Sequence, residues 1–298
     1  MTDQSVIPEP AANSPNHAAE SPDFGEVGPQ LVSLSSERPG RCAAFVTAVQ
    51  FLTRVPLSTP EPVSAAVLSR CPVYFPVVGG LIGVVTSVVL GIAGLFWPVW
   101  LAVMAALAVE ARLTGAFHED AVADFCDAFG GGWTRDDVLR ILKDSRIGSF
   151  GALGLGMAVA LRTGAMIEVI QQAGRHNWLV WSSAIVASCA IGRFVMVVLM
   201  ISVPLVPSRE SLSRDLGRQL KLRDLLTASI WMLPFVLPFF IQLPVQAAIC
   251  VVALVPIVIW FMTLVRRRLG GITGDCLGCI CYGSMVVVLL AAAARWNP

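Results

Sequence analysis

Charged residues are scarce in this sequence: aspartate, glutamate, lysine and arginine make up 14% of its 298 residues. Soluble domains carry about 25% charged residues, so this scarcity argues against a soluble fold. Neither sign of charge dominates, because the formal net charge is +1. A chain without a basic excess gives no indication of a nucleic-acid partner. Any electrostatic function must therefore come from local clusters of charge.

The N-terminal segment lacks hydrophobic periodicity. Residues 1–40 are rich in proline, serine, alanine and acidic residues, and such a segment buries too little apolar surface to offset the entropy lost on ordering. It also has no basic region followed by an apolar one, so we expect no secretory signal peptide. We predict a disordered polar tail over 1–40 and an integral membrane domain over 41–298.

A disulfide framework is absent as well. Eight cysteines are scattered along the chain, mostly inside apolar segments, and this pattern favours small buried thiols. Cys276, Cys279 and Cys281 come close to a metal-binding spacing, but no histidine lies nearby. A metal site at these three cysteines is the alternative to buried thiols.

Long apolar runs are abundant: 56% of the residues are hydrophobic and the mean hydropathy is +0.74. Seven runs have about the 20 residues that an α-helix needs to cross the hydrocarbon core, and none alternates as barrel strands do. The predicted fold class is therefore all-α, a polytopic transmembrane helical bundle. The runs cover residues 73–96, 98–117, 149–172, 178–206, 225–241, 245–265 and 275–294. The segment 42–56 is too short to cross the membrane, so we predict an interfacial or re-entrant helix there.

Basic residues gather in three of the segments between these runs. Residues 118–148 hold four, residues 208–224 hold five, and three arginines occupy 266–268. Two runs separate each segment from the next, so all three lie on one side of the membrane. The positive-inside rule makes that side cytoplasmic.

Acidic residues gather in one stretch, "HEDAVADFCDAFGGG" at 118–132, in which no basic residue interrupts Glu119, Asp120, Asp124 and Asp127. If the second run continues as a helix through this stretch, the three aspartates lie within about 60° of one another, with Glu119 to one side. Such carboxylates repel one another unless a cation binds, and Mg²⁺ takes one or two carboxylates plus substrate phosphate. The stretch therefore predicts a magnesium site with these four acids as ligands. The alternative is a solvated helix end with incidental acids.

Two local signals follow the acids. Gly130–Gly132 predict a flexible turn at which a ligand can approach the backbone. We expect Gly131 to contact the substrate there. Thr134 and Asp137 predict a capping box at the start of a short helix. Together they place a hinge between the acids and the next segment.

That next segment is cationic. The sequence "KDSRIGSFG" at 143–151 puts Lys143, Asp144, Ser145 and Arg146 directly before the third apolar run. Two cations, small residues and a helix N-terminus suit a phosphate group, whereas ordinary positive-inside flanking charge is the alternative. Acids and cations on either side of a glycine hinge suit metal-assisted phosphoryl or nucleotidyl transfer.

Further charges lie inside or beside the apolar runs. Arg193 lies in the middle of the fourth run, where a cation is costly and usually functional or paired, and we interpret it as a substrate contact. Asp275 follows the glycine-rich "GGITG" and is either a helix-dipole partner or a further substrate contact. Two further pairs of opposite charge lie within single runs. They are Arg162 with Glu168 in the third run and Glu110 with Arg112 in the second run, and one interpretation is that each pair is a structural ion pair.

Five motifs occur in the order seen in one known family. They are "QFLTRVP" (50–56), "YFPVVGGLIG" (74–83), "TGAFHEDAVADFCDAFGGG" (114–132), "ILKDSRIGSFG" (141–151) and "GGITGDCLG" (270–278). Over residues 42–294 the chain resembles the cobalamin synthase, or adenosylcobinamide-GDP ribazoletransferase, family. The resemblance implies a Mg²⁺-dependent enzyme of the bacterial cytoplasmic membrane, active late in cobalamin biosynthesis. Such an enzyme joins adenosylcobinamide-GDP to α-ribazole or its 5′-phosphate and releases GMP.

On this interpretation residues 41–298 are a catalytic domain with its site facing the cytoplasm. The catalytic residues are Asp120, Asp124, Asp127, Lys143, Asp144 and Arg146. The substrate-binding residues are Gly131, Ser145, Arg146, Arg193 and Asp275. The partners are the two substrates and membrane lipid, without nucleic acid, and a homo-oligomer is compatible with this class of protein.

Two other classes of protein compete with this interpretation. A CDP-alcohol phosphotransferase also uses Mg²⁺ on spaced aspartates, but its D-G-x₂-A-R start is absent, since Asp120 is followed by "AVADF". A transporter would use intramembrane charges such as Arg193 and Glu168, but transporters often have repeated halves, and no internal repeat is evident.

Overall fold

The computed structural model describes residues 40–57, 64–206 and 220–295. Throughout these residues the regular elements are helices, and no strand forms beyond one isolated β-bridge between Leu205 and Ile272. The predicted all-α fold is confirmed. The tail predicted over 1–40 lies, up to residue 39, outside the described residues.

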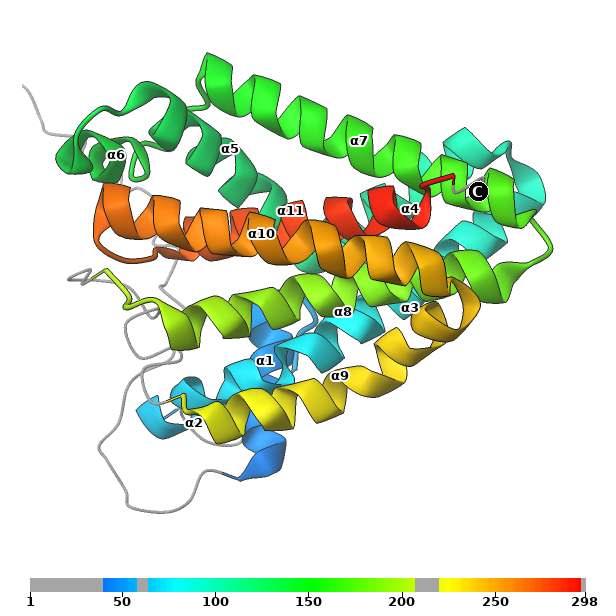
Figure 1. Ribbon diagram of the computed structural model, residues 1–298, viewed down its shortest axis with the longest axis horizontal. Helices are drawn as coiled ribbons and strands as arrows, with labels where there is room; N and C mark the ends of the chain where they lie inside the picture. The colour runs from blue at the N-terminus through cyan, green and yellow to red at the C-terminus, as the bar shows by residue number, and fades with distance from the viewer. Residues whose placement is uncertain (1–39, 58–63, 207–219, 296–298) are drawn as a thin grey trace, which may run out of the picture.

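Six helices of the described chain are long and apolar enough to cross a membrane. They run along the length of the bundle (Figure 1) and are α3 (Phe75–Phe96), α7 (Ser149–Ala173), α8 (Trp178–Ser202), α9 (Leu222–Gln242), α10 (Pro244–Leu269) and α11 (Gly274–Ala292). A seventh crossing forms if α4 (Val99–Thr114) and α5 (Phe117–Gly131) count as one broken span. The chain is thus a multi-pass membrane protein, with six such helices in its described part, or the seven that the sequence predicts if the bent pair is one span.

The α4–α5 span is bent, which corrects the expectation of one continuous helix. The two helices meet at 88°, and both residues of the joint, Gly115 and Ala116, have left-handed φ angles of 74° and 56°. The segment after α1 enters this joint, because the backbone N–H of Arg54 donates to the carbonyl of Leu113 over 2.7 Å. A Cβ on Gly115 would overlap the side chain of Arg54. The left-handed φ angle of Gly115 favours glycine at this position.

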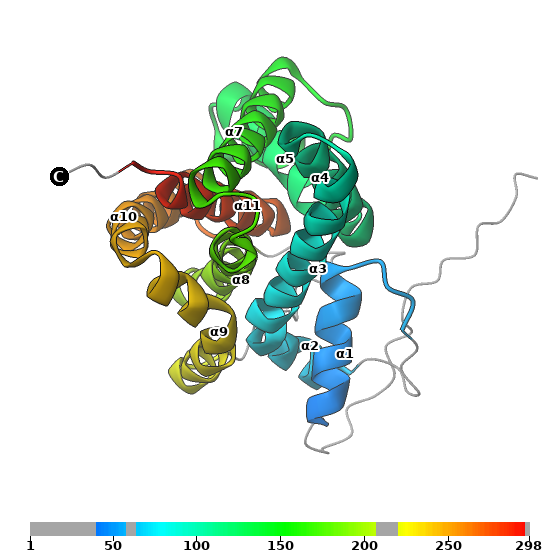
Figure 2. The same cartoon turned by 90° about the vertical axis from the view of Figure 1, so that its right-hand side faces the viewer.

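Four short elements complete the described chain: α1 (Arg41–Leu52), α2 (Ala65–Arg70), the 3₁₀-helix η1 (Cys71–Tyr74) and α6 (Arg135–Ile141). The 12 residues of α1 are too few to cross a membrane, as predicted, and α1 lies beside α3 (Figure 2). Phe51 at its end stacks on Phe75 and meets Phe117 edge-on. The short helix α1 therefore packs against the start of α5.

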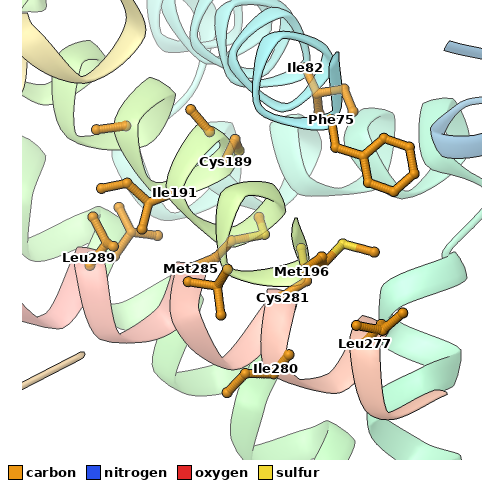
Figure 3. Packing of buried hydrophobic residues seen from close by; sticks show 14 of the residues in the cluster. Phe75, Ile82, Cys189, Ile191, Met196, Leu277, Ile280, Cys281, Met285 and Leu289 are labelled. Carbon is orange, nitrogen blue, oxygen red and sulfur yellow. The ribbon is translucent and has the colours of Figure 1, made fainter. Parts of the chain in front are cut away.

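The core forms around α8, which lies between α3, α9 and α11 (Figure 2). Most of its residues are buried, as expected for a helix that is apolar on all sides. Figure 3 shows Cys189, Ile191 and Met196 of α8 between side chains of α3 and α11. Five of the eight cysteines are buried, and all are free thiols, so the buried-thiol interpretation is confirmed for Cys276 and Cys281.

Three segments that are distant in sequence meet at one end of the bundle, on the left of Figure 1. There α6 contacts the end of α10, because Arg135 Nε donates to the carbonyl of Leu269 over 2.9 Å. The segment after α8 contacts the connection between α10 and α11, because the backbone N–H of Ile272 donates to the carbonyl of Pro204 over 2.9 Å. We call this end the polar end. The C-terminus of α11 lies at the opposite end.

Candidate active site

The acidic stretch forms one face of α5. Asp120 is exposed, while Asp124 and Asp127 are half-buried, so the shared helical face survives the bend at Gly115. The glycine turn predicted after the acids is wrong: Gly130 and Gly131 belong to the last turn of α5, and Gly132 caps it. Gly131 is exposed there.

Asp275 brings a fourth carboxylate to this face from α11. Thr273 caps the start of α11 by accepting from the N–H of Cys276 over 3.3 Å. One turn further on, a Cβ at Gly278 would clash with Ala121 of α5, so the two helices nearly touch. Asp275 is consequently close enough to repel Asp120 and Asp124 electrostatically. We call Asp120, Asp124, Asp127 and Asp275 the acidic patch.

Asp127 has a structural role that the sequence did not reveal. Its carboxylate accepts from the backbone N–H groups of Gly148 and Gly151, over 2.7 and 2.8 Å. It thereby caps the N-terminus of α7 and fixes that helix to α5. Two of the N–H groups expected to meet a phosphate are thus already bound to Asp127.

This contact explains two glycines of the "IGSFG" segment. A Cβ on Gly148 or Gly151 would overlap the carboxylate of Asp127, and at Gly151 it would also lie 2.8 Å from the carbonyl oxygen of Ala123. The backbone of α5 cannot easily yield at that point. The close approach of the two helices therefore depends on glycine at both positions.

Gly151→Ala is expected to displace α5, lower transfer activity at least about tenfold and destabilise the fold by about 1–3 kcal/mol, as overpacking does. The matched control is Gly156→Ala on the same helix, where the added Cβ meets nothing within 4 Å. Activity and thermal unfolding in detergent should separate the two variants. Equal activities and equal unfolding temperatures of Gly151→Ala and Gly156→Ala would refute the inference that α5 and α7 pack closely at Gly151.

The "KDSRIG" segment lies between α6 and α7, with Lys143 and Ser145 exposed. The predicted capping box of α6 is present, formed by Thr134 and Asp137. Arg146 binds the carboxylate of Asp144 through two guanidinium nitrogens, the shorter contact being 2.7 Å. These hydrogen bonds lower the pKa of Asp144 to about 2, so its carboxylate stays ionised at neutral pH and orients the Arg146 fork.

Arg193 and Glu119 point into the bundle instead of toward the open face. Arg193 is 1% exposed, and its Nη1 donates to the carbonyl of Cys189 and to the sulfur of Met285. The Oε2 atom of Glu119 is buried without a hydrogen-bond partner among the described residues. The structure therefore brings Asp120, Asp124, Asp127 and Asp275 together and separates Arg193 and Glu119 from them.

The predicted pairs within single spans are wrong. Arg162 of α7 binds both carboxylate oxygens of Glu110 of α4, over 2.7 and 2.8 Å, and Thr86 of α3 donates to the same carboxylate over 2.8 Å. Glu168 pairs instead with Arg295, beyond α11. Both pairs join segments that are distant in sequence, which spacing along a single run cannot indicate.

The comparison with known proteins agrees with the motifs. A family model described as cobalamin-5-phosphate synthase matches residues 44–293. The chain belongs to this family. A curated relative from Shewanella frigidimarina is named adenosylcobinamide-GDP ribazoletransferase and is 34% identical over 78% of this chain and 87% of its own length. A relative of the same name from Shewanella baltica (strain OS195) is 32% identical over 82% of this chain and 94% of its own length. No solved structure matches the chain significantly.

In this cobalamin-5-phosphate synthase family member, the donor set suits a hard cation that binds together with its substrate. In the described part of the chain, no three His, Cys, Asp or Glu side chains converge closely enough to hold an ion by themselves. Magnesium, however, typically takes one or two carboxylates and completes its shell with phosphate and water. The oxygen ligands of the acidic patch fit that requirement.

Proposed function

We propose that this protein is an adenosylcobinamide-GDP ribazoletransferase that acts late in cobalamin biosynthesis. The observation that carries the proposal is that four carboxylates from α5 and α11 lie on one face at the polar end, where the "KDSRIG" segment also lies. The names of its relatives supply adenosylcobinamide-GDP as donor and a ribazole as acceptor. The family resemblance of the motifs implies that the acceptor is α-ribazole or its 5′-phosphate.

In the proposed reaction, the ribazole hydroxyl oxygen forms a bond to the cobinamide-side phosphorus of the diphosphate. The bond from that phosphorus to the bridging oxygen breaks, GMP leaves with that oxygen, and the hydroxyl proton is released. The substrate diphosphate is strongly anionic, so the acidic patch would repel it without a cation between them. Asp120 and Asp124 are the residues we assign to holding magnesium, with Asp275 beside them.

Magnesium bound at these carboxylates would neutralise the diphosphate and stabilise the charge that develops on departing GMP. The protein's own cations would complete this task, because Lys143 and Arg146 are exposed and the Nη1 atom of Arg146 is not used in its contact with Asp144. Asp144 holds the Arg146 guanidinium in one orientation. Asp127 keeps α7, and with it the cationic segment, against α5.

Arg146→Lys is expected to lower kcat/KM about 10- to 100-fold, since lysine keeps the charge but loses the planar fork that binds phosphate at two points. Arg140→Lys on α6 is the control, because its side chain is also exposed and its pair with Asp137 is a single contact at 3.4 Å. Unchanged kinetics in Arg146→Lys would mean that Arg146 serves only as a positive charge that sets the orientation of the protein in the membrane.

We also infer that the polar end faces the cytoplasm, because the basic residues of α6, of the "KDSRIG" segment and of the end of α10 lie there. Single cysteines at Trp133, which is 88% exposed, and at Gln242 test this inference in a cysteine-free variant. An impermeant thiol reagent added to intact cells should label position 242 and not position 133. Position 133 should react only after permeabilisation. Labelling of position 133 in intact cells would reverse the orientation.

The activity itself is tested with detergent-solubilised protein, adenosylcobinamide-GDP and α-ribazole. Release of GMP that requires both substrates and stops on chelation of divalent cations supports the proposal. Absence of GMP release from well-folded protein supplied with Mg²⁺ would refute it.

A further inference from the structure

Two adjoining hollows lie at the end of the bundle opposite the polar end. The first is an apolar groove of about 390 Å³ between α3 and α8. Only two of its lining residues carry a side-chain hydroxyl, Ser87 and Ser182. Its remaining walls include Val88, Ile92 and Leu95 of α3 with Trp178, Trp181 and Val186 of α8.

The second hollow, of about 290 Å³, adjoins the groove and is polar at one side. It shares Gly91, Leu95 and Trp181 with the groove, and Arg175 and His176 of the α7–α8 connection line it. Among the residues that the structure describes, no acidic side chain lines either hollow. The combined space is therefore apolar along the helices and cationic at its outer end.

In the described part of the chain, no carboxylate pairs with Arg175. Its Nη2 donates to the carbonyls of Gly94 and Trp97, which terminate α3, whereas Nε and Nη1 have no partner among the described residues. Arg295, the other arginine at this end, is paired with Glu168. An exposed cation beside a hydrocarbon-lined groove, with two donor nitrogens unused, is complementary to an amphiphile with an anionic head.

We propose that these two hollows form a binding site for a phospholipid of the bilayer with an anionic headgroup. An acyl chain fills the α3–α8 groove, and the headgroup phosphate receives hydrogen bonds from Arg175, with His176 beside it. Trp178 begins α8 and Trp97 follows α3, and tryptophans at the ends of membrane helices gather at the membrane interface. The headgroup end of the site lies beside the last turn of the 22-residue helix α3, about 30 Å along that helix from its first turn, at 1.5 Å per residue, so it is distinct from the proposed active site.

Native mass spectrometry of the purified full-length protein tests the site. Delipidated protein is titrated with phosphatidylglycerol or with phosphatidylcholine of the same acyl chains. The wild type should retain at least about fivefold more phosphatidylglycerol, roughly 1 kcal/mol of preference. Equal retention of the two lipids would overturn the proposal.

Three variants locate the preference. Arg175→Gln removes the charge but keeps an amide that can donate to the α3 carbonyls, and it should abolish the preference at an unchanged melting temperature in detergent. Gly91→Leu fills the junction of the hollows and should reduce binding of both lipids. Arg140→Gln, which removes an exposed arginine at the polar end, should change nothing. A preference that survives Arg175→Gln would overturn the proposal, and none of these readouts depends on transferase activity.

Discussion

Asparagine at position 124 is expected to lower GMP release at least about a thousandfold, because metal-assisted charge stabilisation is worth several kcal/mol and each 1.4 kcal/mol is tenfold in rate. Asp124 is central to the acidic patch, since the charges of Asp120, Asp127 and Asp275 all act on it. Removing its charge weakens the patch as a cation site without altering side-chain volume. Steady-state release of GMP at saturating Mg²⁺ measures the effect.

The control for this variant is Asp136→Asn, which removes an exposed carboxylate from α6 at the same end of the bundle. It should retain near-normal activity. Asp124→Asn must also insert into the membrane and unfold at the wild-type temperature for its loss of activity to be interpreted. A well-folded Asp124→Asn variant with more than about a tenth of wild-type turnover would contradict its assignment as a metal ligand.

Glu110→Gln should cause the largest loss of stability, about 3–5 kcal/mol, because it leaves the buried Arg162 without its counter-charge. Both side chains are almost completely buried, at 3% and 1% exposure. Arg162 also lies over the ring of Tyr282, 5.2 Å from its centroid, so it has no path to water. Thermal unfolding in detergent should show the loss.

The double variant Glu110→Met/Arg162→Met provides the control for charge. If the uncompensated cation causes the instability, replacing both partners by apolar residues restores much of the stability. Removal of the exposed Arg140–Asp137 pair by Arg140→Gln should lower the free energy of unfolding by less than about 1 kcal/mol. A double variant that is less stable than Glu110→Gln would show that packing, not charge, dominates at this position.

Local patterns in the sequence predicted the helices and the acidic face correctly. The spacing of Asp120, Asp124 and Asp127 places them on one side of any helix that contains them, whatever surrounds it. Apolar length likewise predicted the spans. The capping box at Thr134 needs only residues three positions apart.

Features that depend on contacts between distant residues could not be predicted in this way. The bend at Gly115 depends on Arg54, which enters from another part of the chain. The partner of Arg162 lies 52 residues away. Asp275 joins the acidic patch only because Gly278 allows α11 to contact α5. The glycines of "IGSFG" can be read directly from the sequence. Their close contact with the carboxylate of Asp127, which explains why glycine is needed there, cannot.

Binding of Mn²⁺, followed by electron paramagnetic resonance, tests the central claim that the acidic patch binds a divalent cation together with the substrate diphosphate. Detergent-solubilised wild type should bind Mn²⁺ at least about tenfold more tightly when adenosylcobinamide-GDP is present, because phosphate oxygens complete the metal's ligands. The variant Asp120→Asn/Asp124→Asn should lose that increase while unfolding at the wild-type temperature. Equal Mn²⁺ affinity of the wild type and this double variant in the presence of adenosylcobinamide-GDP would contradict the account.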